Sequence, residues 1–249
     1  MPSLHRISRS LMLLACLLAL AGCGGAKRGD GGPTRVQPER PAKGEGMIIA
    51  TLGDSIVAGS PAWDPDPDVR DTLVEADRDS QWQRWVRSDA ELRNCGVWGE
   101  RTDEIATRFS RCTDGAEGVV IQGGINDIVQ GRDVADAARD LACIAERARG
   151  AGLRVALVEV LPWNNGDATS ARAIDQLNAR IHAVAERGGV PVLPFHAVLE
   201  DRDQPSRMPQ NRTVEGDHPN VAGYRELGRR AWREPETPNG AFASDCPEP

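Results

Sequence analysis

The stretch MIIATLGDS, residues 47–55, predicts a short buried strand that ends at a sharp turn. Its first six residues are apolar or β-branched and carry no charge, which is typical of a strand that is buried on both faces of a parallel sheet. The Gly-Asp-Ser turn leaves the Ser55 hydroxyl at the carboxyl end of this strand. Ligands of open α/β sheets bind at that edge, so Ser55 is a candidate nucleophile.

A serine becomes an effective nucleophile only with a base and an oxyanion site, and three later blocks offer these groups. Gly99 lies in a loop that follows a predicted strand, where a glycine lets a backbone N–H approach a substrate closely. Asn126 follows the next apolar run and offers an amide donor at the same sheet edge. His218 precedes a proline suited to the first turn of a final helix, and it is the candidate base.

Together these blocks resemble the SGNH (GDSL-type) hydrolase superfamily of esterases and lipases, and they span residues 47–232 in the family's order. The resemblance implies that Ser55 is the nucleophile and His218 its base. It also implies that the backbone N–H groups of Ser55 and Gly99 and the side chain of Asn126 form the oxyanion hole. The fold that the family implies is a flavodoxin-like three-layer α/β/α sandwich.

One position departs from the family pattern. The family usually places an aspartate three residues before the histidine, and this chain has Glu215 there. A turn can bring a carboxylate three residues back to the imidazole, whereas Asp217 has difficulty reaching round from the adjacent position. We therefore expect Glu215 to orient His218, with Asp217 as the alternative acid.

The rhythm of the chain independently predicts an α/β fold with a five-stranded parallel sheet covered on both faces. Apolar runs predict strands, and periodic segments between them predict helices. The strands are expected at 47–52, 91–95, 119–122, 154–160 and 190–193, and the helices at 81–88, 103–111, 134–149, 171–187 and 221–232.

The N-terminus predicts export. A short positive region and an apolar stretch too short to span a bilayer are typical of a signal peptide at residues 1–22. Leu-Ala-Gly-Cys at its end resembles a bacterial lipobox, which implies a lipid anchor on Cys23 and a protein held in the cell envelope (outer membrane or periplasm in a Gram-negative cell). A plain secretory signal is the alternative. Residues 23–46 predict a flexible tether, residues 47–233 the hydrolase domain and residues 234–249 a tail.

The cysteines left after export are even in number, which favours two disulfides in an exported protein. These are Cys95, Cys112, Cys143 and Cys246. Three pairings are possible. We favour Cys95–Cys112, which brackets the Gly99 loop, and Cys143–Cys246, which ties the tail to a helix; free thiols are the alternative.

Composition mainly excludes classes of function. The net charge of −7, without a basic stripe, argues against a nucleic-acid partner. We expect no cofactor, because dinucleotide and phosphate-loop glycine motifs are missing, and no metal, because no cysteine or histidine pair has zinc spacing. We also expect a monomer.

The predicted function is therefore a serine esterase that acts on short acyl groups, in a small ester or an acetylated glycan. Trp63, Trp98 and Trp163 follow predicted strand ends, where their rings are expected to form a substrate rim. An alternative interpretation is that these rings only seal the domain. An acyltransferase acting on envelope glycans and a carbohydrate-binding lipoprotein without catalysis remain alternative functions.

Overall fold

The computed structural model describes residues 46–246. The predicted signal peptide, the anchor residue Cys23 and the tether up to residue 45 lie outside this part of the chain. Within residues 46–246, none of the helices combines the length and the apolar character needed to cross a membrane.

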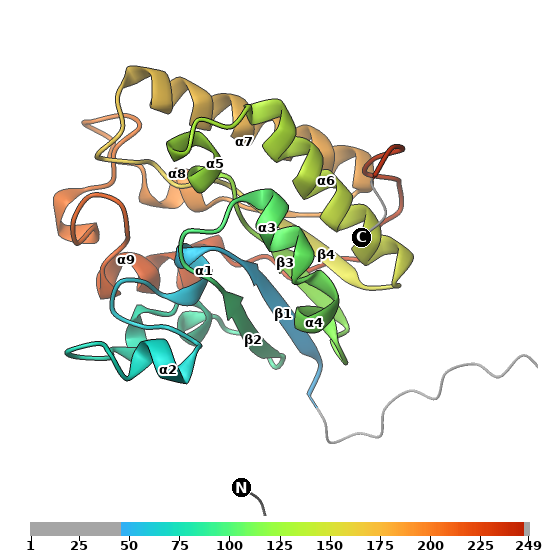
Figure 1. The fold of residues 1–249 in the computed structure, drawn as a ribbon, viewed down its shortest axis with the longest axis horizontal. Coiled ribbons are helices and arrows are strands. Elements are labelled where there is room, and N and C mark those ends of the chain that lie inside the picture. Colours follow the sequence, from blue (N-terminus) through green and yellow to red (C-terminus); the bar gives the residue numbers. More distant parts are fainter. Residues whose placement is uncertain (1–45, 247–249) are drawn as a thin grey trace, which may run out of the picture. The chain divides into compact units, whose positions relative to one another are not determined.

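The central element is a five-stranded sheet in which all neighbouring strands are parallel, as predicted (Figure 1). The strands are β1 (Ile48–Gly53), β2 (Glu91–Gly96), β3 (Gly118–Ile121), β4 (Arg154–Val158) and β5 (Val192–Leu193). Their order is β2-β1-β3-β4-β5. The chain therefore runs from β1 to β2 on one side of β1 and later returns as β3 on the other side of β1. Ligands of doubly wound sheets bind at such a switch point.

Alternate residues of the strands face two separate apolar cores, which confirms a three-layer fold. Ala50 and Leu52 of β1 belong to a core shared with the long helices α6 (Val134–Gly150) and α7 (Ala168–Gly188). Ile49 belongs to the opposite core, which short helices cover. The short elements on that face include η2 (Trp82–Trp85), α8 (Phe195–Leu199), α9 (Val221–Glu226) and the π-helical η4 (Leu227–Ala231).

Two predicted helices are shortened or divided in the structure, in segments whose side chains bond to distant parts of the chain. The helix expected at 81–88 is a single 3₁₀ turn, η2, in which the Gln83 side chain donates to the Val57 carbonyl at 2.9 Å. The helix expected at 103–111 is divided at Arg108 into α3 (Thr102–Thr107) and α4 (Phe109–Thr113). The predicted final helix begins at Val221 and ends as η4.

Two predicted strands are shorter than expected. β4 ends at Val158, and two residues later the N–H of Val160 donates to the Asn178 side chain at 2.7 Å. The N–H of Val190 donates to the Ala185 carbonyl at the end of α7, so this residue belongs to the helix terminus and β5 begins at Val192.

Both favoured disulfides are present, Cys95–Cys112 and Cys143–Cys246. The second joins the tail to α6. Phe242 of the tail is 1 % exposed and packs against Gly188, and Glu236 forms an antiparallel bridge with Val155 of β4. The described part of the tail is therefore integrated into the domain.

Candidate active site

Ser55 lies at the carboxyl end of β1, as the first residue of the short helix α1 (Ser55–Ala58). The turn before Ser55 requires glycine because two side chains approach it closely. A Cβ on Gly53 would lie 2.5 Å from Val57 Cγ2 and 2.6 Å from Gln122 Oε1. Ser55 is 5 % exposed. The close packing around Gly53 thus places Ser55 at the sheet edge, where its neighbours cover most of it.

Asp54 stabilises the turn before Ser55 through hydrogen bonds and is fully buried. Its Oδ1 accepts a hydrogen bond from the Ile56 N–H at 2.9 Å, which caps α1. Gln122, one residue past β3, donates to Asp54 Oδ2 at 3.1 Å and accepts from the Asp54 N–H at 3.2 Å. Burial raises the pKa of Asp54 to about 6, although the bonds from Ile56 and Gln122 oppose the shift.

His218 reaches Ser55 from a loop far along the chain. Its Nε2 lies 3.0 Å from Ser55 Oγ, and its Nδ1 contacts Glu215 Oε1. A proton on Nδ1 that is donated to Glu215 leaves Nε2 free to accept the Ser55 proton. The structure therefore brings Ser55, His218 and Glu215 into the arrangement of a nucleophile, a base and an orienting acid.

Asp217 makes different contacts. Its Oδ1 accepts hydrogen bonds from Trp163 Nε1 at 2.5 Å and from Asn165 Nδ2 at 2.6 Å. Asn165 Nδ2 also donates to the Glu215 carbonyl at 2.9 Å. The loop after β4 thus fastens the loop that carries His218, and the imidazole takes its carboxylate contact from Glu215.

The two remaining oxyanion candidates lie next to each other. Asn126, in α5 (Ile125–Val129), donates from Nδ2 to the Glu100 carbonyl at 2.9 Å, one residue from Gly99. Gln130 Nε2 donates to the Gly99 carbonyl at 3.2 Å. Gly99 has φ +78°, a conformation that favours glycine. Because an amide has two N–H groups, Asn126 keeps a second donor for a substrate oxygen.

Arg108 supports this loop, a role that the sequence analysis missed. Its guanidinium contacts the Glu100 carboxylate, with Nη2 2.6 Å from Oε2. It also donates to the carbonyls of Cys95 at 2.9 Å and Gly53 at 3.1 Å. One side chain therefore ties the ends of β1 and β2 to the loop of Gly99. No signal in the sequence distinguishes this arginine from the others in its predicted helix.

A second missed support lies beneath Asn126. Asp127 is fully buried and accepts from the Thr102 N–H at 3.0 Å and from Arg132 Nη1 at 2.6 Å. These bonds hold α5 against the start of α3, just after the Gly99 loop. A charged residue beside a predicted catalytic asparagine was a usable signal for such a network.

The three rim tryptophans have different surroundings. Trp98 is 68 % exposed and immediately precedes Gly99. Trp63 is covered by the guanidinium of Arg70, 4.6 Å from its ring centroid. Trp163 donates a hydrogen bond to Asp217, in the loop that carries His218. Among residues 46–246, no group of three or more histidine, cysteine or acidic side chains is arranged to hold a metal ion.

Comparison with known proteins gives a family and a fold. The profile of the GDSL-like Lipase/Acylhydrolase family matches residues 51–226. The chain has no significant match among curated proteins.

Solved structures similar to this one include a GDSL-like lipase from Bacteroides thetaiotaomicron, at 21 % identity and TM-score 0.58 over 76 % of this chain and 87 % of that one. A member of the lipolytic G-D-S-L family from Veillonella parvula has 21 % identity and TM-score 0.57 over 73 % and 94 %. An acetyl xylan esterase from Geobacillus stearothermophilus has 18 % identity and TM-score 0.58 over 76 % and 93 %. At these identities the similarity establishes the shared fold.

Proposed function

Because this chain belongs to the GDSL-like lipase/acylhydrolase family, we propose that it hydrolyses carboxylic esters through an acyl-enzyme on Ser55. The observation that carries the proposal is the continuous contact from Ser55 Oγ through His218 to Glu215, with 3.0 Å between Oγ and Nε2. A serine held this way needs no metal or cofactor to attack an ester.

In the proposed mechanism, His218 Nε2 takes the proton of Ser55 as Oγ attacks the ester carbonyl carbon. The carbonyl oxygen becomes an oxyanion that accepts from the N–H groups of Ser55 and Gly99 and from the free N–H of Asn126. His218 then gives its proton to the departing alcohol. Water, deprotonated by the same imidazole, finally attacks the acyl-enzyme and releases the acid.

Glu215 stabilises the imidazolium that forms in both steps and fixes the ring with Nδ1 protonated. Its side chain is 40 % exposed, so water screens part of this interaction. We expect Glu215 to contribute mainly by orienting the ring, and Asp217 to act indirectly by holding Trp163 and Asn165 against the loop.

We propose short acyl groups as the substrate class, with O-acetylated glycans and small acetyl esters as candidates. The exposed ring of Trp98 beside Gly99 supports a substrate with a face that stacks on tryptophan. One protein with the same fold is an acetyl xylan esterase, which is consistent with acetyl chemistry on this scaffold.

For location, we propose a lipid anchor on Cys23 that holds the enzyme in the bacterial cell envelope. The support is the lipobox-like sequence after an apolar stretch at residues 11–20. Incorporation of a labelled fatty acid into the wild type but not into Cys23→Ser is the expected result. Equal labelling of both proteins contradicts the anchor.

The function is tested by hydrolysis of p-nitrophenyl acetate, butyrate and octanoate by wild type and Ser55→Ala. The control is Ser110→Ala, an exposed serine on α4. We expect activity in the wild type and the control, a preference for acetate, and only background in Ser55→Ala. Retained activity in Ser55→Ala contradicts the mechanism. Formation of an acetylated sugar when a glycan acceptor is added identifies transfer instead of hydrolysis.

A further inference from the structure

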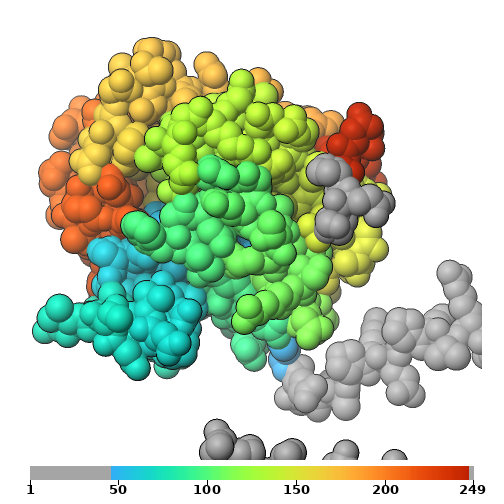
Figure 2. Space-filling model, in the orientation of Figure 1, coloured from blue at the N-terminus to red at the C-terminus, as the bar shows by residue number. Residues whose placement is uncertain are grey.

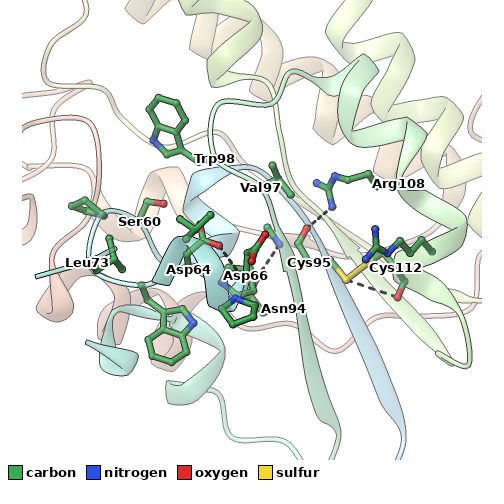
Figure 3. A pocket seen from close by; sticks show the side chains of 17 residues that line it. Ser60, Asp64, Asp66, Leu73, Asn94, Cys95, Val97, Trp98, Arg108 and Cys112 are labelled. Atoms are coloured by element: carbon green, nitrogen blue, oxygen red, sulfur yellow. Dashed lines mark hydrogen bonds between the residues drawn. A yellow bond between two sulfur atoms is a disulfide. The ribbon is translucent and has the colours of Figure 1, made fainter. Parts of the chain in front are cut away.

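A cavity of about 850 Å³ lies beside the edge strand β2, and the proposed mechanism gives it no role. One wall is the segment 60–73, which includes the short helix α2 (Pro67–Arg70). The other wall is the end of β2 together with α4 and the Cys95–Cys112 disulfide (Figure 3). Figure 2 shows the segment around α2, in cyan, projecting from the domain beside the green atoms of the opposite wall. This volume is typical of pockets for small molecules.

The cavity reaches the start of the loop that carries Gly99, an oxyanion candidate. Trp98 lines it, and the N–H of Gly99 belongs to the peptide bond between Trp98 and Gly99. Ser60 also lines the cavity, and its N–H donates to the Ser55 carbonyl at 3.0 Å. A group bound here therefore lies next to Trp98 and the residues that adjoin the Ser55 and Gly99 segments.

The walls are mainly apolar. Three large hydrophobic residues that line the cavity are unusually exposed, namely Val69 at 45 %, Val97 at 39 % and Trp98 at 68 %. Exposed apolar side chains that gather around one hollow are typical of a ligand site. Three prolines and Leu73 add further apolar surface.

The charged groups of the lining are mostly engaged by the protein itself. Asp64 is 7 % exposed, and its carboxylate accepts from the Asp66 N–H at 2.8 Å. Arg108 is bonded to Glu100 and to two backbone carbonyls. Asp66 is exposed, and its carboxylate accepts from the Asp68 N–H at 2.9 Å at the start of α2. Arg111 remains, and it is exposed to solvent. A planar apolar group therefore fits this cavity better than an ion.

We propose that this cavity binds the alcohol portion of the ester and selects an aromatic or similarly apolar ring there. The inference rests on the proposed function, because a short acyl group does not need this volume and the alcohol is then the larger part of the substrate. Trp98 contacts the ring at the mouth, and Val69 and Leu73 contact it from the opposite wall. Of the two candidate substrate classes above, the inference selects the small ester, with an alcohol that bears an apolar ring, over the acetylated glycan.

The test compares 2-naphthyl acetate with methyl acetate in wild type, Val69→Arg and Val74→Arg. Val69 lines the cavity, whereas Val74 is fully exposed outside it. We expect Val69→Arg to lower the ratio of kcat/KM for the naphthyl ester to that for the methyl ester by about 10-fold or more, because the arginine fills space that the ring needs. Val74→Arg should leave the ratio at its wild-type value. Val69→Trp repeats the test with a filling side chain that carries no charge.

Equal ratios in wild type and both Val69 variants overturn the inference. A Val69 effect confined to methyl 2-naphthoate assigns the cavity to the acyl group, and an effect confined to acetylated xylose assigns it to a sugar; both results contradict an apolar alcohol site.

A binding experiment separates this inference from the proposed function. We expect 2-naphthol to bind Ser55→Ala, and to bind the double variant Ser55→Ala with Val69→Arg at least about 10-fold more weakly. Esterase activity that survives in Ser55→Ala refutes the proposed mechanism. Equal affinity for 2-naphthol with and without Val69→Arg refutes the assignment of the cavity.

Discussion

The buried carboxyl of Asp54 makes the stability of the protein depend on pH in a predictable way. Its pKa is raised from the ordinary 3.8 to about 6 by burial beneath the Ser55 turn. In the unfolded chain the group ionises near pH 4, while in the folded protein it holds its proton until about pH 6. Between these values the unfolded state has lost a proton that the folded state keeps, so rising pH favours unfolding.

The size of the effect follows from the shift. One pKa unit corresponds to about 1.4 kcal/mol, so a shift from 3.8 to about 6 lowers the free energy of unfolding by about 3 kcal/mol in all, of which about 2.4 kcal/mol is lost between pH 4 and pH 7. The loss is complete above the folded pKa and absent below the unfolded one. Asp54→Asn removes the titrating group and abolishes this component.

The assay is urea unfolding of wild type and Asp54→Asn, with disulfides intact, at intervals from pH 4 to pH 8. The hydrogen bond to Gln122 that Asn cannot reproduce shifts the variant by a constant amount, so the informative quantity is how the difference changes with pH. We expect the variant to gain about 2.4 kcal/mol relative to wild type between pH 4 and pH 7. Parallel curves, with a change below about 1 kcal/mol, refute the reasoning.

Three further predictions concern the site and the scaffold. Asn126→Ala removes one oxyanion donor and should lower kcat for p-nitrophenyl acetate by about 100- to 1000-fold; a loss below about 10-fold contradicts the assignment. Glu215→Gln should lower kcat by about 100-fold or more, whereas Asp217→Asn, which keeps an acceptor for Trp163, should cost less than about 10-fold; the reverse order identifies Asp217 as the acid. Removing the Cys143–Cys246 disulfide opens a loop of 103 residues and should lower the free energy of unfolding by about 4–5 kcal/mol, which chemical denaturation of the double serine variant measures.

The parts of the fold that the sequence predicts well are those with strong local signals. The apolar run before Gly53 places β1, and the long periodic segments place α6 and α7 within a few residues of their observed bounds. Short elements such as α5 and α8 carry too few residues for a periodic signal, and contacts with distant segments decide their conformation.

In the candidate site, too, residues in local motifs are predicted from the sequence, whereas contacts between distant residues are not. Ser55, Asn126 and His218 follow from motifs, and the contact of His218 with Glu215 matches the three-residue spacing. The bond between Asp54 and Gln122 joins residues 68 positions apart and depends on β1 lying next to β3.

The supports of the loop and the wall of the cavity depend on tertiary structure. Arg108 acts where a predicted helix is interrupted, and its partners lie on two different strands. One wall of the cavity is an acidic, proline-rich segment that has no periodic pattern, so the position of this segment against β2 could not be inferred from local sequence.

The central claim is that Ser55 becomes covalently acylated, and labelling with a p-nitrophenyl phosphonate ester tests it most directly. This reagent leaves a stable phosphonyl group on an activated serine. We expect loss of esterase activity in step with release of p-nitrophenolate, and peptide mass mapping that finds the phosphonyl group on Ser55, with His218→Ala labelled far more slowly. Inactivation of the wild type with the label on another residue, or none on Ser55, contradicts the account.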